Sequence, residues 1–101
     1  MIKIVLKGIS EDIVPTEFQL SQNYPNPFKG KTTIKYCVPG KMKIRLEIFD
    51  FNGNKVKTLV DELKEAGTYI TEFNRNKLTG GEYYYKLESS NFFEIKKMNL
   101  L

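Results

Sequence analysis

The sequence predicts an all-β protein, a seven-strand antiparallel β-sandwich, from three observations. Seven short segments alternate apolar and polar side chains, as half-buried strands do. They recur about every 10 residues and are separated by turn-forming pairs such as Pro39-Gly40 and Asn52-Gly53. No segment has the apolar periodicity of a helix. Seven strands without a helix are typical of two sheets packed face to face.

The expected strands follow one another from residue 18 onward. The first is Phe18–Gln22, which stops at Tyr24 because Pro25 and Pro27 fix φ and lack an N–H. Asn52-Gly53 predicts a hairpin, since both residues accept positive φ. Residues 61–67 are expected to form a loop, because the segment is short and ends in glycine. The other six expected strands are 32–38, 44–49, 55–60, 69–73, 83–87 and 92–101.

Residues 1–14 are expected to lie outside this fold. Apolar residues alternate with lysine in Met1–Lys7, which suggests a short strand, although Val5 breaks the alternation. Gly8–Pro15 contains Gly, Ser, Pro and two acids, which is typical of a linker. We therefore place the domain boundary there, so that residues 15–101 form the domain. Met1–Lys7 does not resemble a signal peptide. Either the chain starts here and the general export pathway has no signal to read, or it is the end of a longer protein. Residues 1–14 are then a linker or the remnant of a preceding cargo region.

Composition excludes several function classes. The apolar content of 41% and charged content of 28% are typical of a soluble globular domain. No apolar run approaches the ~20 residues that span a bilayer, so membrane insertion is not expected. The net charge of +4 is scattered, which favours a mixed solvated surface over a nucleic-acid interface. The absence of histidine removes Ser-His and Cys-His catalysis and imidazole metal sites, and no cofactor is expected.

Two motifs could bind a ligand, and each has a structural alternative. Asp50–Asn54 begins like a calcium loop, but Lys55 and Asp61 occupy the positions that need Gly and Glu, and a hairpin turn explains the same residues. Tyr83-Tyr84-Tyr85 could stack on bases or sugars. Strand alternation sends Tyr83 and Tyr85 inward, however, so core filling is the favoured interpretation.

Other candidate reactive groups are expected to be structural. Cys37, the single cysteine, is expected to be a partly exposed, inert thiol. Several carboxylates fall in the outward phase of their strands and are expected on solvated faces: Glu47, Glu72, Glu82, Glu88 and Glu94. The terminal segment Lys96–Leu101 leaves two interpretations open. It is either an edge strand protected by lysines or an address read by a receptor.

Three segments, in order, resemble one known family. The first is Phe18-x-Leu20-x-Gln22-Asn23-Tyr24-Pro25-Asn26-Pro27-Phe28; the second runs from Ile44 through Gly53 to Leu59; the third joins Gly67-x-Tyr69 to Gly81-x-Tyr83-x-Tyr85-x-Leu87 and Lys96-Lys97-Met98. Together they resemble the type A C-terminal sorting domain of the type IX secretion system, the Por secretion system sorting domain family. The resemblance covers about Pro15 to Leu101. Its structural motif residues are Asn23, Tyr24, Pro25, Asn26, Pro27, Phe28, Gly53, Gly67, Gly81 and Tyr83.

The resemblance implies an immunoglobulin-like sandwich that is not an enzyme. It implies that the domain directs a fused N-terminal cargo from the periplasm across the outer membrane, so that the cargo is secreted or displayed at the cell surface. It also implies that a sortase-like peptidase removes the domain upstream of its first strand and anchors the cargo on the surface. The residues most associated with recognition map to the tail: Lys96, Lys97, Met98, Leu100 and Leu101.

Two further interpretations stay open at this point. The domain could be an immunoglobulin-like accessory module that binds carbohydrate or protein within a larger secreted protein. It could also form a homodimer by edge-strand pairing. The chain departs from the family at Lys29-Gly30, where Asn-Pro is common, and at Phe73-Asn74, where Trp-Asp is common. Phe fills much of the same core volume, so the predicted fold is unchanged, but loss of the Asp is expected to loosen the following turn.

Overall fold

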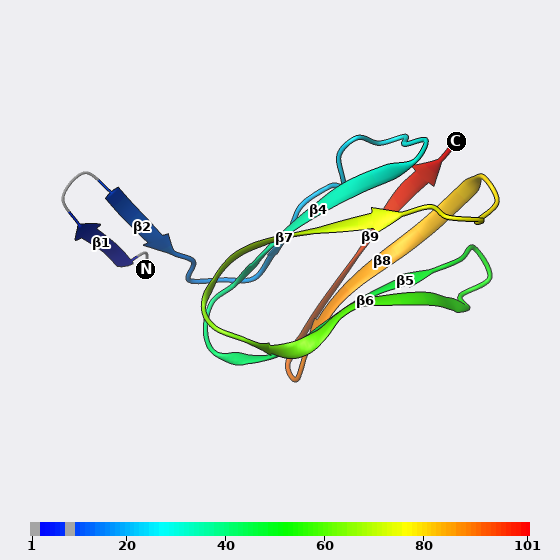
Figure 1. The fold of residues 1–101 in the computed structure, drawn as a ribbon. Coiled ribbons are helices and arrows are strands. Elements are labelled where there is room, and N and C mark those ends of the chain that lie inside the picture. Colours follow the sequence, from blue (N-terminus) through cyan, green and yellow to red (C-terminus); the bar gives the residue numbers. More distant parts are fainter. Residues whose placement is uncertain (1–2, 8–9) are drawn as a thin grey trace.

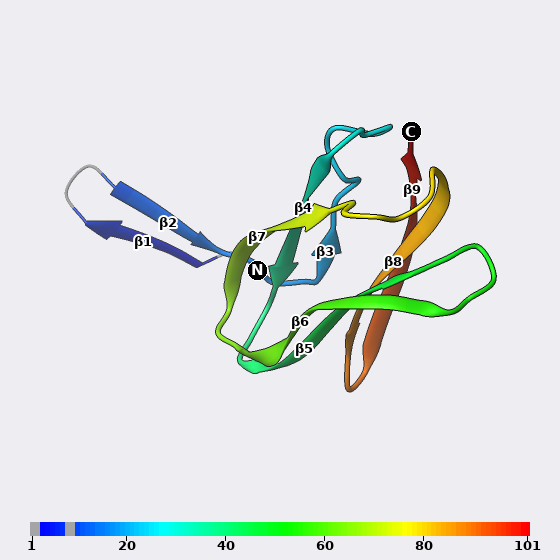
Figure 2. The same cartoon turned by 45° about the vertical axis from the view of Figure 1, so that its right-hand side comes forward.

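The computed structural model describes residues 3–7 and 10–101, and this part of the chain contains strands and no helix. Figures 1 and 2 show the strands, coloured in chain order from blue to red. They are β1 (Lys3–Lys7), β2 (Ser10–Val14), β3 (Gln19–Leu20), β4 (Lys31–Val38), β5 (Met42–Phe49), β6 (Lys55–Lys64), β7 (Gly67–Asn74), β8 (Gly81–Ser89) and β9 (Phe92–Leu100).

The strands β3 to β9 form two antiparallel sheets that pack face to face (Figures 1 and 2). One sheet has the order β3-β4-β7 and the other β6-β5-β8-β9. The prediction of an all-β, seven-strand antiparallel sandwich is confirmed, and the topology is compatible with an immunoglobulin-like fold. β6 and β9 are therefore the two edges of the larger sheet.

β1 and β2 pair with each other, from Lys3↔Val14 to Lys7↔Ser10, in a sheet of their own. Figure 1 shows this hairpin outside the two sheets. The expected N-terminal strand is present as β1. The segment interpreted as a linker contains β2, to which β1 supplies backbone partners along its whole length. The domain boundary near residue 15 stays a prediction.

The core comes from alternate residues of facing strands, as the period-2 pattern predicts. On β4 the inward side chains are Ile34, Tyr36 and Val38, as expected. The Phe28 and Phe73 rings meet edge to face with centroids 6.1 Å apart, so Phe73 fills its expected core position. The other buried apolar side chains of this cluster are Leu20, Ile44, Leu46, Ile48, Tyr83, Tyr85, Leu87, Met98 and Leu100.

β6 corrects the expected loop at residues 61–67. The strand continues to Lys64 because β5 begins at Met42 and pairs with it over the whole of this length, from Met42↔Lys64 onward. Its polar end fits an edge strand, where charged side chains need no burial. Lys43 Nζ, for example, lies 3.5 Å from an Asp61 carboxylate oxygen across the ladder.

Two polar side chains expected at the surface are buried, and both lie on central strands. Cys37 on β4 is covered by Gln19 on β3 and Thr68 on β7, its two register partners. Its Sγ lies 3.5 Å from Gln19 Oε1 and 3.4 Å from Thr68 Oγ1. Glu47 on β5 is only 6% exposed, and Lys55 Nζ lies 3.2 Å from its carboxylate. Strand alternation predicts the face of the sheet on which a side chain lies. It does not predict how far side chains on the neighbouring strands bury that side chain.

Candidate recognition site at the terminal strand

The candidate site is β9, the last strand and one edge of the larger sheet. It pairs with β8 in continuous register, from Gly81↔Leu100 to Ser89↔Phe92. Alternation divides its side chains between the two faces of the sheet. Met98 and Leu100 belong to the core, so Phe92, Glu94 and Lys96 share their face, whereas Phe93, Ile95, Lys97 and Asn99 lie on the outer face.

The five residues expected to mediate recognition are therefore not equally accessible. Met98 and Leu100 are buried, whereas Leu101 is 64% exposed. Lys96 and Lys97 lie on opposite faces of the sheet. Lys96 Nζ is 3.5 Å from a Glu94 carboxylate oxygen, and Lys97 Nζ is 3.5 Å from one of Glu82. The basic pair thus presents one charge on each side of the strand.

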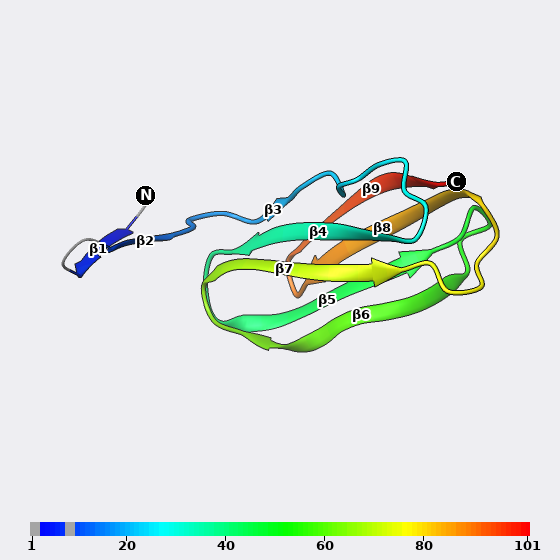
Figure 3. The same ribbon diagram turned by 45° about the horizontal axis from the view of Figure 1, so that its top comes forward.

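The segment 22–28, which contains the motif QNYPNPF, runs along the outer edge of β9; we call it the edge clasp. The Gln22 Nε2 group donates to the Lys97 carbonyl (2.7 Å), and the Asn99 N–H donates to Asn26 Oδ1 (2.9 Å). The Phe28 backbone forms a short parallel bridge to the strand end, accepting from the Leu101 N–H (2.9 Å). The edge clasp and the tail thus form one structural unit, as Figure 3 shows near the C terminus.

Buried polar groups hold the edge clasp to both sheets. The Asn23 side-chain amide donates to Thr32 Oγ1 on β4 (3.0 Å), and the Thr32 hydroxyl donates to the Pro25 carbonyl (2.8 Å). The Tyr85 hydroxyl on β8 donates to the Ser21 carbonyl (2.7 Å) and accepts from the Asn23 N–H (2.9 Å). Burial raises the pKa of Tyr85 to about 12. The hydroxyl that donates to Ser21 therefore keeps its proton to a higher pH than an ordinary tyrosine does.

A glycine pair at the start of β8 makes room for the chain end. A Cβ on Gly80 would lie 2.9 Å from the Leu101 carbonyl carbon and 3.2 Å from the Leu100 oxygen. Gly81 has a φ of +148°, which favours glycine. Gly81 was recognised as a motif residue from the sequence, but the close approach at Gly80 was not. The Gly-Gly pair signalled only a turn.

The edge clasp covers only the C-terminal half of the β9 edge. The backbone groups that it binds belong to Lys97, Asn99 and Leu101. On an edge strand, the N–H and C=O groups of every second residue point away from the neighbouring strand. The N–H and C=O groups of Phe93 and Ile95 therefore also point away from β8. Both side chains are exposed on the outer face, Phe93 by 64% and Ile95 by 52%. The sequence did not distinguish these two residues, because apolar residues that alternate with polar ones occur in every expected strand and do not show which strand is an uncovered edge.

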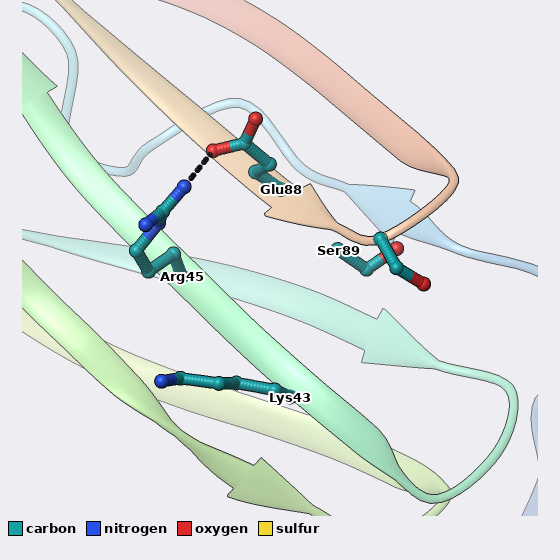
Figure 4. Close-up of a pocket in the computed structure, with 5 residues that line it drawn as sticks. Lys43, Arg45, Glu88 and Ser89 are labelled. Carbon is teal, nitrogen blue, oxygen red and sulfur yellow. Dashed lines mark hydrogen bonds and ion pairs between the residues drawn. The ribbon is translucent and has the colours of Figure 1, made fainter.

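Another candidate is a shallow hollow of about 270 Å³ on the larger sheet, shown in Figure 4. The residues that line it all have polar side chains and include Lys43, Arg45, Glu88 and Ser89. The Arg45 guanidinium donates to Glu88 over 2.7 Å and thereby lowers the pKa of that carboxyl group. Arg45 is therefore already paired, as is Lys43, whose Nζ lies 3.5 Å from Asp61, and this weakens the hollow as an anion site.

The remaining sequence candidates have structural roles. Asp50 Oδ1 accepts from the Asn52 and Asn54 N–H groups, both at 2.9 Å, and Gly53 has a φ of +85°, so the calcium-like motif forms the expected hairpin turn. Tyr83 and Tyr85 point into the core, as expected, and Tyr84 is half-buried on the outer face. Within residues 3–7 and 10–101, no cluster of three metal-ligating side chains was found.

The turn after Asn74 is closed by a residue that the sequence did not identify. The Arg75 N–H donates to the Gly30 carbonyl (2.9 Å), and its guanidinium donates to the carbonyls of Lys29 (3.0 Å) and Leu78 (3.2 Å). Arg75 thus ties this turn to the chain that follows the edge clasp.

Comparison with known proteins gives one match. Residues 22–100 match the family model described as "Secretion system C-terminal sorting domain". The matched region begins at the first residue of the edge clasp and ends at the last residue of β9. No curated protein and no solved structure matched the chain. Among the described residues, no helix is long and apolar enough to cross a membrane.

Proposed function

The chain belongs to the family of secretion system C-terminal sorting domains, which are sorting signals for type IX secretion. We therefore propose that its sandwich is a folded, non-catalytic sorting signal for a fused cargo protein. The observation that carries this proposal is the family match, which extends from the edge clasp to the end of β9. The two ends of the match meet in the fold, since the Phe28 N–H donates to the Asn99 carbonyl (3.0 Å). A transport address needs a stable body with an accessible peptide feature, and this unit has both.

The proposed address is the tail, with roles divided according to burial. Met98 and Leu100 anchor the strand in the core and position it. The accessible groups are the ammonium groups of Lys96 and Lys97 and the side chain of Leu101. An exposed strand edge also offers backbone groups for strand addition by a component of the secretion machinery. The edge clasp positions the tail but is not itself the address.

The proposed route begins in the periplasm, where the fused cargo and this domain fold. The type IX machinery then transfers both across the outer membrane, and a sortase-like peptidase cleaves upstream of β3. Cleavage near Pro15 would separate the cargo and the β1–β2 hairpin from the sandwich. The cargo then stays on the cell surface or is released. The separate sheet formed by β1 and β2 supports a boundary at this point.

The first test attaches residues 15–101 to a periplasmic reporter in a bacterium that has a type IX system. We expect the reporter at the cell surface or in the medium, and in the periplasm when the outer-membrane component of the system is deleted. The same reporter without the domain is the control. Equal export with and without the domain would refute the sorting role.

The second test concerns the tail alone. Deleting it would remove the core residues Met98 and Leu100, so point variants are needed. The double variant Lys96→Ala/Lys97→Ala should reduce export about tenfold while the unfolding transition stays within about 0.5 kcal/mol of the original. The control, Lys35→Ala/Lys57→Ala, removes two exposed lysines from β4 and β6. Equal loss in both variants would indicate that only net charge matters.

The alternative function is an accessory module that binds carbohydrate or protein. Its support is the polar hollow near Arg45 and Ser89 and the half-buried ring of Tyr84 on the outer face of the same sheet. A glycan-binding screen should find affinity that Tyr84→Ala abolishes if this function is correct. A domain that binds no glycan and still exports the reporter would exclude the carbohydrate form of this alternative.

A further inference from the structure

The uncovered half of β9 is an open strand edge with apolar side chains at the surface. Its backbone groups at Phe93 and Ile95 point away from β8, and both side chains are exposed and apolar. A strand edge of this kind is a template for another strand. The opposite edge of the same sheet, β6, is protected in the usual way, since five of its ten residues are charged.

We propose that this half-edge binds a second copy of the chain, with β9 pairing antiparallel to β9 about a twofold axis that passes between the two Ile95 residues. In this register Ile95 lies opposite Ile95 of the second copy, and Phe93 lies opposite Lys97. The groups that point outward belong to residues 93, 95 and 97, so Ile95 can exchange two N–H···O=C bonds with its counterpart. The proposal does not depend on the sorting role.

Charge selects this register. One position away from Ile95 on either side, Glu94 of each copy lies opposite Lys96 of the other copy. The charges of the strand are therefore complementary to those of a second, antiparallel copy. In the single chain Lys96 Nζ lies 3.5 Å from the Glu94 carboxylate, and the two side chains are 30% and 38% exposed. Both groups can therefore be reached by a second strand, and both are next to Ile95. Opposite charges directly across a ladder stabilise it, and like charges destabilise it. A shift by two residues, centred on Lys97, would place the two Lys97 side chains opposite each other.

The edge clasp limits the pairing to this short segment. Gln22 binds the Lys97 carbonyl, and Asn26 and Phe28 bind Asn99, so a second strand cannot pair with that carbonyl or continue past it without displacing these groups. The pairing that needs no displacement is centred on Ile95. The interface is therefore small, and complexes of small area are weak. We expect a dimer that is populated only as the concentration approaches roughly a millimolar.

The test measures self-association of the 101-residue chain by sedimentation over roughly 10 μM to 1 mM. Glu94→Lys places two lysines opposite each other across the axis, and Lys96→Glu places two glutamates opposite each other. Each single reversal should weaken the dimer about tenfold, because the twofold axis repeats the unfavourable pair. The double variant Glu94→Lys/Lys96→Glu keeps the register complementary and should restore association. The control, Lys57→Glu on β6, should not change it.

A second measurement uses the unmutated chain, so its result does not depend on whether a variant folds. Hydrogen exchange of the Ile95 amide should slow as concentration rises, whereas exchange of the Asn99 amide, bound by Asn26, should not change. A chain that stays monomeric up to about 1 mM would overturn the proposal. So would a folded double variant that fails to restore association, or exchange at Ile95 that is independent of concentration.

Discussion

At the scale of single residues, the hydroxyl of Tyr85 joins the two parts of the candidate site. It donates to the Ser21 carbonyl and accepts from the Asn23 N–H, so one buried atom binds the chain at the start of the edge clasp to β8. Strand alternation predicted that this side chain points inward. It could not identify these partners, because they lie more than sixty positions away in the sequence.

Tyr85→Phe should lower the free energy of unfolding by about 1–3 kcal/mol, because the buried Asn23 N–H and the partly buried Ser21 carbonyl lose their partner. Denaturant unfolding at pH 7 measures the difference. Tyr69→Phe is the matched control, since the Tyr69 hydroxyl donates to the Glu65 carbonyl at an exposed position where water can replace it. A loss at Tyr85 no larger than at Tyr69 would contradict the assigned role.

The same residue predicts a pH dependence. Burial raises the pKa of Tyr85 from its ordinary value of 10.0 to about 12 in the folded chain. The folded state therefore keeps this proton at pH values where the unfolded state releases it, and stability falls with rising pH. The contribution is complete below about pH 10 and is lost as pH rises through about 12. The stability difference between the original chain and Tyr85→Phe should therefore narrow over this interval, and a constant difference would show that Tyr85 does not titrate in this way.

At the scale of elements, the site depends on the packing of three segments against one another. β8 pairs with β9, the edge clasp covers the end of β9, and Gly80 leaves space for the chain terminus. Each contact restricts the position of Leu101, whose side chain is exposed. The tail is thus held in one place although it is the end of the chain.

Gly80→Ala should displace this tail. The added Cβ would lie 2.9 Å from the Leu101 carbonyl carbon, closer than such contacts allow, so the chain end must move. We expect a loss of about 1–3 kcal/mol in stability, typical of overpacking, and faster hydrogen exchange at the Leu101 amide. Gly30→Ala is the control, since a Cβ there meets nothing within 4 Å. Equal losses of stability at both positions would indicate that the backbone at each site simply prefers glycine. The loss at Gly80 would then not come from a clash with the tail.

The elements also show what a sequence can and cannot predict. The inward positions Ile34, Tyr36 and Val38 follow from alternation, because burial of one face imposes a period of two. The end of β6 could not be predicted from alternation, because an edge strand needs no buried side chains. Residues 61–64 are held in the strand by backbone pairing with β5. The resemblance located the edge clasp and the tail as separate motifs. Their contact depends on side-chain and backbone bonds between distant segments, which spacing alone does not reveal.

At the scale of the whole molecule, the chain divides into a hairpin and a sandwich. β1 and β2 pair only with each other, and strands β3 to β9 form the two sheets. The sandwich supplies the described core cluster, whose buried members run from Leu20 to Leu100. The family match, residues 22–100, lies entirely within this part. The sorting domain and the independently folding unit should therefore coincide.

Removing residues 1–14 tests this division. We expect residues 15–101 to unfold in one cooperative transition, within about 1 kcal/mol of the full chain, because the backbone pairs of β3–β9 do not involve the hairpin. Denaturant unfolding measures the free energy, and amide spectra should superimpose for β4 to β9. As a matched deletion, removing residues 92–101 takes away Met98 and Leu100 from the core and should prevent cooperative folding. A large loss of stability in residues 15–101 would place the hairpin inside the domain and move the boundary, and with it the proposed cleavage region, toward the N terminus.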